Sequence, residues 1–219
     1  HLHRYAIVTN YIKDKIVLDI ASGEGYGSNL MSDKAQFVYG VDIDNETIKE
    51  TISTFKDAVF GKPLTYTLAG SKNNRTGNAS GQLVGGNLTI LHTMLGSKTS
   101  LNTSGKILFI EEIGEYEYHI DRMLQSLKRA GYFDNCKGVI VGDITKVRRN
   151  TTAWGTSVEQ LIVDALSEYN FPIAFNMPAG HDKDNRALIL GRTVELKVEK
   201  DKLYITIPAL RTQVVQIVK

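Results

Sequence analysis

The sequence predicts an α/β fold, and two observations lead to this prediction. Short, almost continuous apolar runs such as residues 15–21 (KIVLDIA) are typical of strands that are buried on both faces. Between these runs lie segments with helical apolar spacing, for example residues 118–130, where the apolar side chains fall on one face. Strands and helices that alternate along the chain indicate a sheet with helices packed on it.

The first part of the chain reads as a compact βαβ unit. We expect a strand at residues 15–21, a glycine-rich loop at 22–28, a short helix, and a second strand at 37–43 (FVYGVDI). A further helix is predicted at residues 45–56, with Asn45 as its N-cap. One face of this helix is expected to carry Ile48, Ile52 and Phe55.

Residues 61–86 differ in composition, because Gly, Ser, Thr and Asn dominate them. We expect irregular structure there, around one short strand at residues 64–68. The remaining predicted elements are a short helix at 87–95, a strand at 106–111, a helix at 118–130 ended by Gly131, a strand at 137–142, a helix that Ser157 opens with Gln160 at capping-box spacing, a strand at 172–176, and a hairpin over 187–208 that turns at 199–202. The predicted domains are residues 1–55 and 56–219.

Composition excludes several classes of function. A formal charge of +2, from 26 basic and 24 acidic residues, gives no reason to expect a nucleic-acid partner. No apolar run approaches the roughly 20 residues of a membrane helix, so we expect no membrane association. Cys136 is the only cysteine, so no cysteine metal cluster can form. Four histidines show no spacing typical of metal ligands, namely His1, His3, His92 and His119, so no metal site is indicated. The expected location is the cytoplasm.

A glycine-rich loop follows the first predicted strand. Gly23, Gly25 and Gly27 allow a tight turn and a close approach of the backbone to a ligand, and a helix N-terminus after them favours anionic groups. Asp42 ends the second strand, where a carboxylate can accept hydrogen bonds from ribose hydroxyls. The alternative is a tight βα turn in a Rossmann-like layer, without a ligand.

This stretch resembles the first motif of the class I S-adenosylmethionine-dependent methyltransferases. The resemblance lies in His3-Arg4-Tyr5, in VLDIASGEGYGS at 17–28 and in YGVDID at 39–44. It implies S-adenosylmethionine as a cofactor, and nothing after residue 50 continues the pattern. The residues that would bind the cofactor are Asp19, Gly23 and Gly25 at its methionine end and Asp42 at its ribose.

Residues 60–208 resemble the C-terminal domain of the serine-type LD-carboxypeptidases, which include muramoyltetrapeptide carboxypeptidases and microcin-immunity peptidases. The matching segments are GQLVGGNLTIL (81–91), KILFIEEIGEYEYHIDRML (106–124) and FPIAFNMPAGHDKDN (171–185), supported by GKPLTY (61–66) and GVIVGDIT (138–145). The resemblance implies hydrolysis of the amide between an L- and a D-centre in small murein peptides. It also implies a Ser-His-Glu triad that needs no cofactor, and it suggests a homodimer.

His181 matches the family histidine and Glu111 the family glutamate. A histidine after glycine in a polar loop is usually only solvated, but the motif around His181 favours the catalytic interpretation. Glu111 and Glu112 are adjacent in a strand and therefore face opposite ways, so only one can serve, and the position in the motif favours Glu111. Residues 85–87 (Gly85, Gly86 and Asn87) are expected either near the substrate or as a helix entry capped by Asn87.

The family's Gly-aromatic-Ser-Asp elbow, which carries the nucleophile on an N-terminal domain, does not occur in this sequence. The nearest string, Gly25-Tyr26-Gly27-Ser28, belongs to the methyltransferase motif, and neither Ser22 nor Ser28 fits the elbow. We therefore expect a chimera with its junction between Asn45 and Phe60. Three hypotheses remain open: an LD-carboxypeptidase relative whose machinery is idle for want of a serine, an S-adenosylmethionine-binding protein, and an inert α/β scaffold.

Overall fold

The computed structural model describes residue 8 and residues 11–20, 31–32, 34–41, 49–149 and 155–209. The chain divides into two compact units, His1–Thr47 and Ile48–Lys219. No helix within these described ranges is long and apolar enough to cross a membrane.

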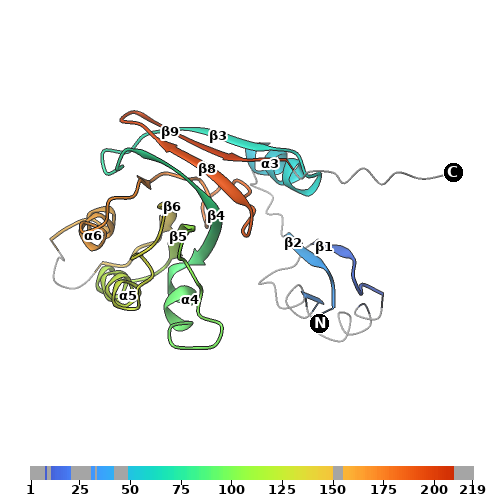
Figure 1. The fold of residues 1–219 in the computed structure, drawn as a ribbon, viewed down its shortest axis with the longest axis horizontal. Coiled ribbons are helices and arrows are strands. Elements are labelled where there is room, and N and C mark those ends of the chain that lie inside the picture. The colour runs from blue at the N-terminus through green and yellow to red at the C-terminus, as the bar shows by residue number, and fades with distance from the viewer. Residues whose placement is uncertain are drawn as a thin grey trace. The chain divides into compact units, whose positions relative to one another are not determined.

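Figure 1 shows the elements of both units. They are, in chain order, β1 (Ile16–Ile20), β2 (Phe37–Val41), α3 (Lys49–Val59), β3 (Leu64–Ala69), β4 (Gly77–Asn87), α4 (Leu88–Thr93), β5 (Ile107–Ile113), α5 (Glu117–Arg129), β6 (Gly138–Thr145), α6 (Val158–Ala165), β7 (Ile173–Ala174), β8 (Thr193–Val198) and β9 (Lys202–Ile207).

The first unit contains the two strands that the sequence predicts. β1 and β2 pair in parallel, with Ile16 opposite Phe37 and Ile20 opposite Val41. A parallel pair needs a crossover between its strands, as the βαβ prediction requires. Residues 31 and 32 are helical, and the glycine loop at 22–28 lies outside the described residues.

The second unit is built on one mixed sheet of seven strands in the order β3-β9-β8-β4-β5-β6-β7. β4 joins its two halves, because its first part pairs antiparallel with β8 and its second part pairs parallel with β5. β5, β6 and β7 continue in parallel, whereas β3, β9 and β8 form an antiparallel extension. The mixed α/β fold that the sequence predicts is therefore confirmed.

The prediction of irregular structure at residues 61–86 was wrong for β4. Its sequence, GNASGQLVGGN, is poor in the β-branched and aromatic residues that favour strands. It is nevertheless an eleven-residue strand, since neighbours on both sides satisfy its backbone hydrogen bonds. Tertiary pairing thus overrides local propensity, and the strand predicted at 64–68 is confirmed as β3.

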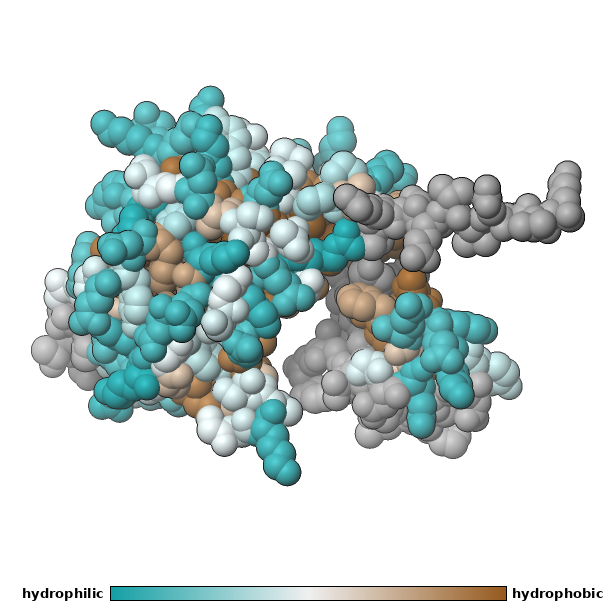
Figure 2. Space-filling model, viewed as in Figure 1, coloured by the Kyte–Doolittle hydropathy of each residue, from teal (hydrophilic) through white to brown (hydrophobic). Residues whose placement is uncertain are grey.

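Both faces of the parallel strands are buried, which explains their continuous apolar runs. On one face, Leu108 and Ile110 of β5 pack with helices α4, α5 and α6. On the other face, Ile107 and Phe109 pack with the inner side of β8 and β9 and with Ala58 of α3. In Figure 2 the visible face of the second unit is mostly hydrophilic, with small hydrophobic areas between the polar residues.

The helices predicted from residue 87 onward are confirmed, and the helix predicted at 45–56 is found as α3 at Lys49–Val59, with two corrections. The predicted N-cap Asn45 and Ile48 lie outside the described residues. The inner face of α5 is buried as expected and consists of Ile120, Met123, Leu124 and Leu127. The predicted face of α3 was wrong at Ile52, which is 52% exposed, because α3 buries Ala58 instead. Ser157 caps α6, but the side chain of Gln160 bonds to Asp164, so the capping box is not reciprocal.

Gly85 and Gly86 of β4 provide a matched test of the β4–β5 contact. Gly85→Ala would place a Cβ 1.9 Å from the carbonyl oxygen of Phe109, whereas Gly86→Ala would meet nothing within 4 Å. Both residues have positive φ, so Gly86→Ala should cost about 1–3 kcal/mol of backbone strain. Gly85→Ala should cost at least about 1–3 kcal/mol more through overlap. Chemical denaturation measures both, and equal losses would contradict the close contact.

Candidate active site

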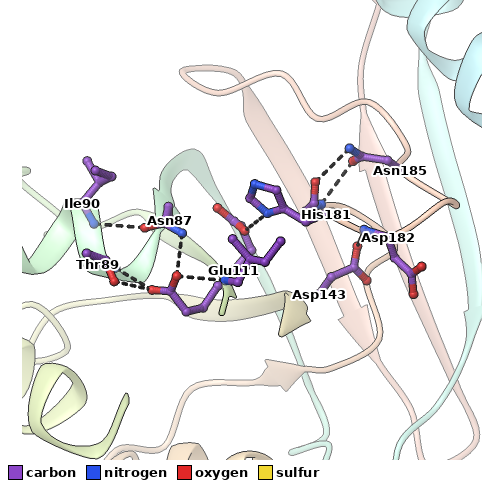
Figure 3. A network of polar contacts seen from close by, with 11 residues as sticks. Asn87, Thr89, Ile90, Glu111, Asp143, His181, Asp182 and Asn185 are labelled. Carbon is purple, nitrogen blue, oxygen red and sulfur yellow. Dashed lines mark hydrogen bonds and ion pairs between the residues drawn. The ribbon is translucent and has the colours of Figure 1, made fainter. Parts of the chain in front are cut away.

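The structure brings Glu111 and His181 together from segments 70 residues apart. Nδ1 of His181 lies 2.9 Å from Oε2 of Glu111, so the ring and the carboxylate share a hydrogen bond (Figure 3). The Glu111 side chain is only 10% exposed, whereas the His181 side chain is 44% exposed. The ring is therefore hydrogen-bonded through Nδ1 to a buried carboxylate, and its other nitrogen, Nε2, lies on the side away from Glu111.

Strand alternation explains why Glu111 and not Glu112 meets the histidine. Glu111 follows the alternation of Ile107 and Phe109, and so it points to the face on which the His181 loop packs through Met177 and Ala179. Glu112 points to the opposite face, toward α4. The sequence-based preference for Glu111 agrees with this geometry.

Glu112 has a structural partner set of its own. Its carboxylate accepts hydrogen bonds from the Asn87 amide at 2.9 Å, from the backbone and hydroxyl of Thr89 at 2.8 and 2.7 Å, and from the Ile113 backbone at 2.9 Å. These donors lie at the N-terminus of α4 and at the end of β5 (Figure 3). Glu112, which is 2% exposed, is thereby fully hydrogen-bonded within the fold.

A bulge in β6 shapes the site beside Glu111. Between the pairs Ile110–Val141 and Glu112–Ile144, β6 carries one residue more than β5. The bulged region contains Gly142, where a Cβ would lie 2.3 Å from the carbonyl oxygen of Ala179. Only glycine allows the His181 loop to come this close.

The structure also places Asp143 at the site, a residue that the sequence did not single out. Its backbone N–H donates to Ala179 at 2.9 Å, and its Oδ2 accepts a long hydrogen bond of 3.4 Å from the Asp182 backbone. Burial raises the pKa of the Asp143 carboxyl, and the backbone N–H of Asp182 opposes the rise. The available signal was its position at the carboxyl end of a buried strand, next to Gly142.

Gly85, Gly86 and Asn87 have different roles in the structure. Asn87 is the N-cap of α4, because its Oδ1 accepts from the Ile90 backbone at 3.1 Å, so the helix-entry interpretation holds for it. Gly85 is required by the close contact with Phe109. Gly86 pairs with Ile110, beside Glu111, and open space lies over its Cα, so substrate binding stays a prediction for this residue.

The predicted cofactor residues fall in the first unit. Asp19 is the fourth residue of β1, and Gly23, Gly25 and Asp42 lie outside the described residues, as do Ser22 and Ser28. S-adenosylmethionine binding therefore stays a prediction. Across the described ranges, no group of three or more His, Cys, Asp and Glu side chains is placed to hold a metal ion.

Two other features lie apart from this pair. His119 contacts Glu115 at 2.8 Å through Nδ1, a second histidine–carboxylate pair, but Glu115 is 29% exposed and lies one turn before it on the same segment. A hollow of about 530 Å³ lies on the outer face of β4, β8 and β9 and is lined mainly by polar side chains. It contains neither Glu111 nor His181, and we assign no chemistry to it.

Comparison with known proteins identifies relatives of this chain. The model of the LD-carboxypeptidase C-terminal domain matches residues 80–196, which is more than half of the chain. The probable murein peptide carboxypeptidase of Bacillus subtilis is 36% identical over 115 residues, which cover 52% of this chain and 36% of that protein. The murein tetrapeptide carboxypeptidase of Pseudomonas aeruginosa is 31% identical over 118 residues, which cover 53% of this chain and 38% of that protein.

Solved structures show the same fold. The muramoyltetrapeptide carboxypeptidase of Oxalobacter formigenes has a TM-score of 0.76 at 23% identity and covers 94% of this chain and 81% of its own. The wild-type apo form of the microcin C7 self-immunity protein MccF has a TM-score of 0.66 at 18% identity, over 94% and 71%. The first likeness covers more than the second unit, so it extends into residues 1–47.

The buried carboxylate of Glu111 should make stability depend on pH. Burial raises the pKa of Glu111, and the charge of His181 opposes the rise. A pKa raised by folding contributes stability that is present at low pH and is lost as the pH rises through the folded-state pKa. As the pH rises from about 4, near the unfolded-state pKa of glutamate, the unfolding free energy of the unaltered protein should therefore fall relative to that of Glu111→Gln until the folded-state carboxyl is ionised. Urea denaturation measures the difference, and a constant difference over this range would contradict it.

Proposed function

Because the chain belongs to the LD-carboxypeptidase C-terminal domain family, we propose that Glu111 and His181 are the carboxylate and the base of a serine-type peptidase. The single observation that carries the proposal is the 2.9 Å contact between His181 Nδ1 and the buried Glu111 carboxylate. A carboxylate accepts hydrogen bonds only, so a charged Glu111 holds the proton of the ring on Nδ1. This leaves the lone pair of Nε2 free to act as a base.

The chemistry follows from that tautomer. Serine is a weak nucleophile at neutral pH, and Nε2 of His181 would take its proton as the hydroxyl attacks an amide carbonyl. The resulting imidazolium is stabilised by Glu111, whose buried position makes the attraction stronger than it would be in water. The same proton then passes from Nε2 to the leaving amine, which breaks the amide bond.

The names of the relatives support a murein peptide as the substrate class. Two curated relatives are a probable murein peptide carboxypeptidase and a murein tetrapeptide carboxypeptidase, and this chain matches little more than a third of each. The proposed substrate is therefore a small peptide with an L,D-amide bond. The proposed nucleophile is a serine. The proposal does not assign it to a particular residue, because neither Ser22 nor Ser28 fits the family elbow.

A second candidate function is S-adenosylmethionine binding by the first unit. The parallel pairing of β1 with β2, with Asp19 near the carboxyl end of β1, is the strand arrangement that a nucleotide-type loop needs. None of the relatives named above is a methyltransferase. A chimeric origin of the first unit stays a proposal, and the fold does not require it, since one carboxypeptidase chain matches 94% of this chain.

Hydrolysis of a murein tetrapeptide tests the peptidase proposal. If a serine of this chain completes the triad, the unaltered chain should release the terminal D-amino acid, and His181→Ala should lower kcat by about 10³-fold or more, because the base is lost. Glu111→Gln should lower kcat by about 10²- to 10⁴-fold, since the ring then loses the charge that fixes its tautomer. Chromatography of the products measures both rates.

His119→Ala is the matched control for this experiment, because His119 also contacts a glutamate through Nδ1. Its rate should equal that of the unaltered chain. If the unaltered chain cleaves nothing, the peptidase proposal fails for this chain and the inert scaffold is favoured.

Titration calorimetry tests the cofactor alternative. If S-adenosylmethionine binds, Asp42→Asn should weaken it by about tenfold or more, since a hydrogen bond to a charged acceptor contributes about 1.5–3 kcal/mol. Asp44→Asn, two residues further on, should leave the affinity unchanged. The absence of any heat with the unaltered chain would remove the cofactor alternative.

A further inference from the structure

The loop that carries His181 needs a support that strands do not supply. Residues 175–192 contain neither helix nor strand, and the structure describes all of them. The ring of His181 is 44% exposed, so side-chain packing alone does not fix it. A base must nevertheless be held within about 0.5 Å of its working position. The contacts of the loop backbone therefore decide whether His181 stays beside Glu111.

Asn185 closes this loop around His181. Its side-chain Nδ2 donates to the carbonyl of Gly180 at 2.9 Å, and its Oδ1 accepts from the Gly180 N–H at 3.1 Å (Figure 3). One amide side chain thus satisfies both backbone groups of the residue that directly precedes His181. A reciprocal pair of this kind fixes orientation as well as distance.

Gly180 is in turn pressed against β6. Its φ is 149°, and a Cβ at this position would lie 2.8 Å from the Cβ of Asp143. Gly180 therefore packs directly on the bulged end of the strand. Its backbone conformation is one that other residues rarely adopt. The two hydrogen bonds of the Asn185 amide stabilise this conformation.

Helix α3 supports the other side of the loop. The Asn185 N–H donates to Oγ1 of Thr51 at 3.0 Å, and the Ala187 N–H donates to Oγ1 of Thr54 at 3.1 Å. Thr51 and Thr54 are three residues apart and lie on the same face of α3. Thr54 also donates to the Glu50 carbonyl at 2.9 Å, which fixes its hydroxyl as an acceptor for the loop.

We propose that Asn185, held in place by Thr51 of α3, is the positioning residue for His181. The chain of contacts runs from Thr51 to Asn185, from Asn185 to Gly180, and from Gly180 to the adjacent His181. The hydrogen bonds of Asn185 and Thr51 run to the loop backbone and not to the ring or to Glu111, so their effect passes through the loop backbone. The inference rests on the proposed function for its consequence in catalysis, but its effect on the His181 ring is measurable without any substrate.

Ring nitrogen NMR of protein labelled with ¹⁵N-histidine tests this directly. At a pH where the ring is neutral, His181 should show a protonated Nδ1 and an unprotonated Nε2, because Nδ1 lies 2.9 Å from the Glu111 carboxylate and a charged carboxylate can only accept a hydrogen bond. Asn185→Ala should shift both signals toward the average of the two tautomers, as the ring leaves its partner. The His181→Gln spectrum assigns the signals among the five histidines of the chain.

His119 is an internal reference in the same spectrum. It contacts Glu115 through Nδ1 in the same way but belongs to α5 and, among the described residues, shares no hydrogen bond with this loop, so its signals should not move in Asn185→Ala. A loss of both patterns together would mean a general loss of structure. In that case the two Thr51 variants described next decide whether Asn185 positions His181.

Thr51→Val and Thr51→Ser separate positioning from folding. Thr51→Val removes the hydroxyl that accepts the Asn185 N–H, and it should shift the His181 signals in the same direction as Asn185→Ala. Thr51→Ser keeps the hydroxyl, so its His181 signals should match those of the unaltered protein. Ser53→Ala is the matched control, because the Ser53 hydroxyl bonds only to Glu50 of the same helix, and its spectrum should equal that of the unaltered protein. Unchanged His181 signals in folded Asn185→Ala or in Thr51→Val would overturn the proposal.

The kinetic arm distinguishes the two proposals. If the chain hydrolyses the tetrapeptide, Asn185→Ala should lower kcat by about 10²-fold with KM nearly unchanged, because a displacement of about 1 Å has that effect on a base. If Asn185→Ala shifts the His181 signals but the unaltered chain hydrolyses nothing, the positioning role is supported and the peptidase proposal is contradicted. A lower kcat with unshifted signals would overturn the positioning role alone.

Discussion

The burial of both faces of β5 is the constraint on which the site depends. Helices α4 and α5 cover one face, and the antiparallel extension with the His181 loop covers the other. Two consecutive glutamates at the end of such a strand must each find polar partners on a different face, because an unpaired buried carboxylate is costly. Glu112 finds them at the N-terminus of α4, and Glu111 finds one in His181. One strand thereby anchors a helix and orients a histidine.

Close backbone contacts that only glycine permits set the geometry around this strand. Gly85 lets β4 approach Phe109, Gly142 lets β6 approach Ala179, and Gly180 lets the loop pack on Asp143. The contacts at Gly142 and Gly180 fix the distance between the loop and the sheet more narrowly than side chains would, because side chains can change rotamer. The distance between His181 and Glu111 is therefore set mainly by backbone contacts.

Burial separates the two histidine–carboxylate pairs of this protein. The contacts of His181 with Glu111 and of His119 with Glu115 are almost equally long, 2.9 and 2.8 Å. The second carboxylate is about three times as exposed and sits on the same segment as its histidine, so solvent weakens the pair. Only the first pair joins the carboxyl end of a buried strand to a separate loop, which is where α/β proteins place reactive groups.

The α/β class and most strand and helix positions could be predicted from the sequence, because apolar periodicity is local to each segment. The candidates Glu111 and His181 followed from the resemblance of their motifs to the LD-carboxypeptidases. The sequence did not reveal β4, whose glycines and small polar residues form a strand only between β8 and β5. Nor did it separate the roles of Gly85 and Asn87 from substrate binding, or single out Asn185 and Thr51 as supports of the loop. These assignments depend on contacts between residues far apart in sequence, such as the 134-residue separation of Thr51 and Asn185. Such contacts emerge only when the chain folds, since no local sequence pattern specifies which distant backbone groups will meet.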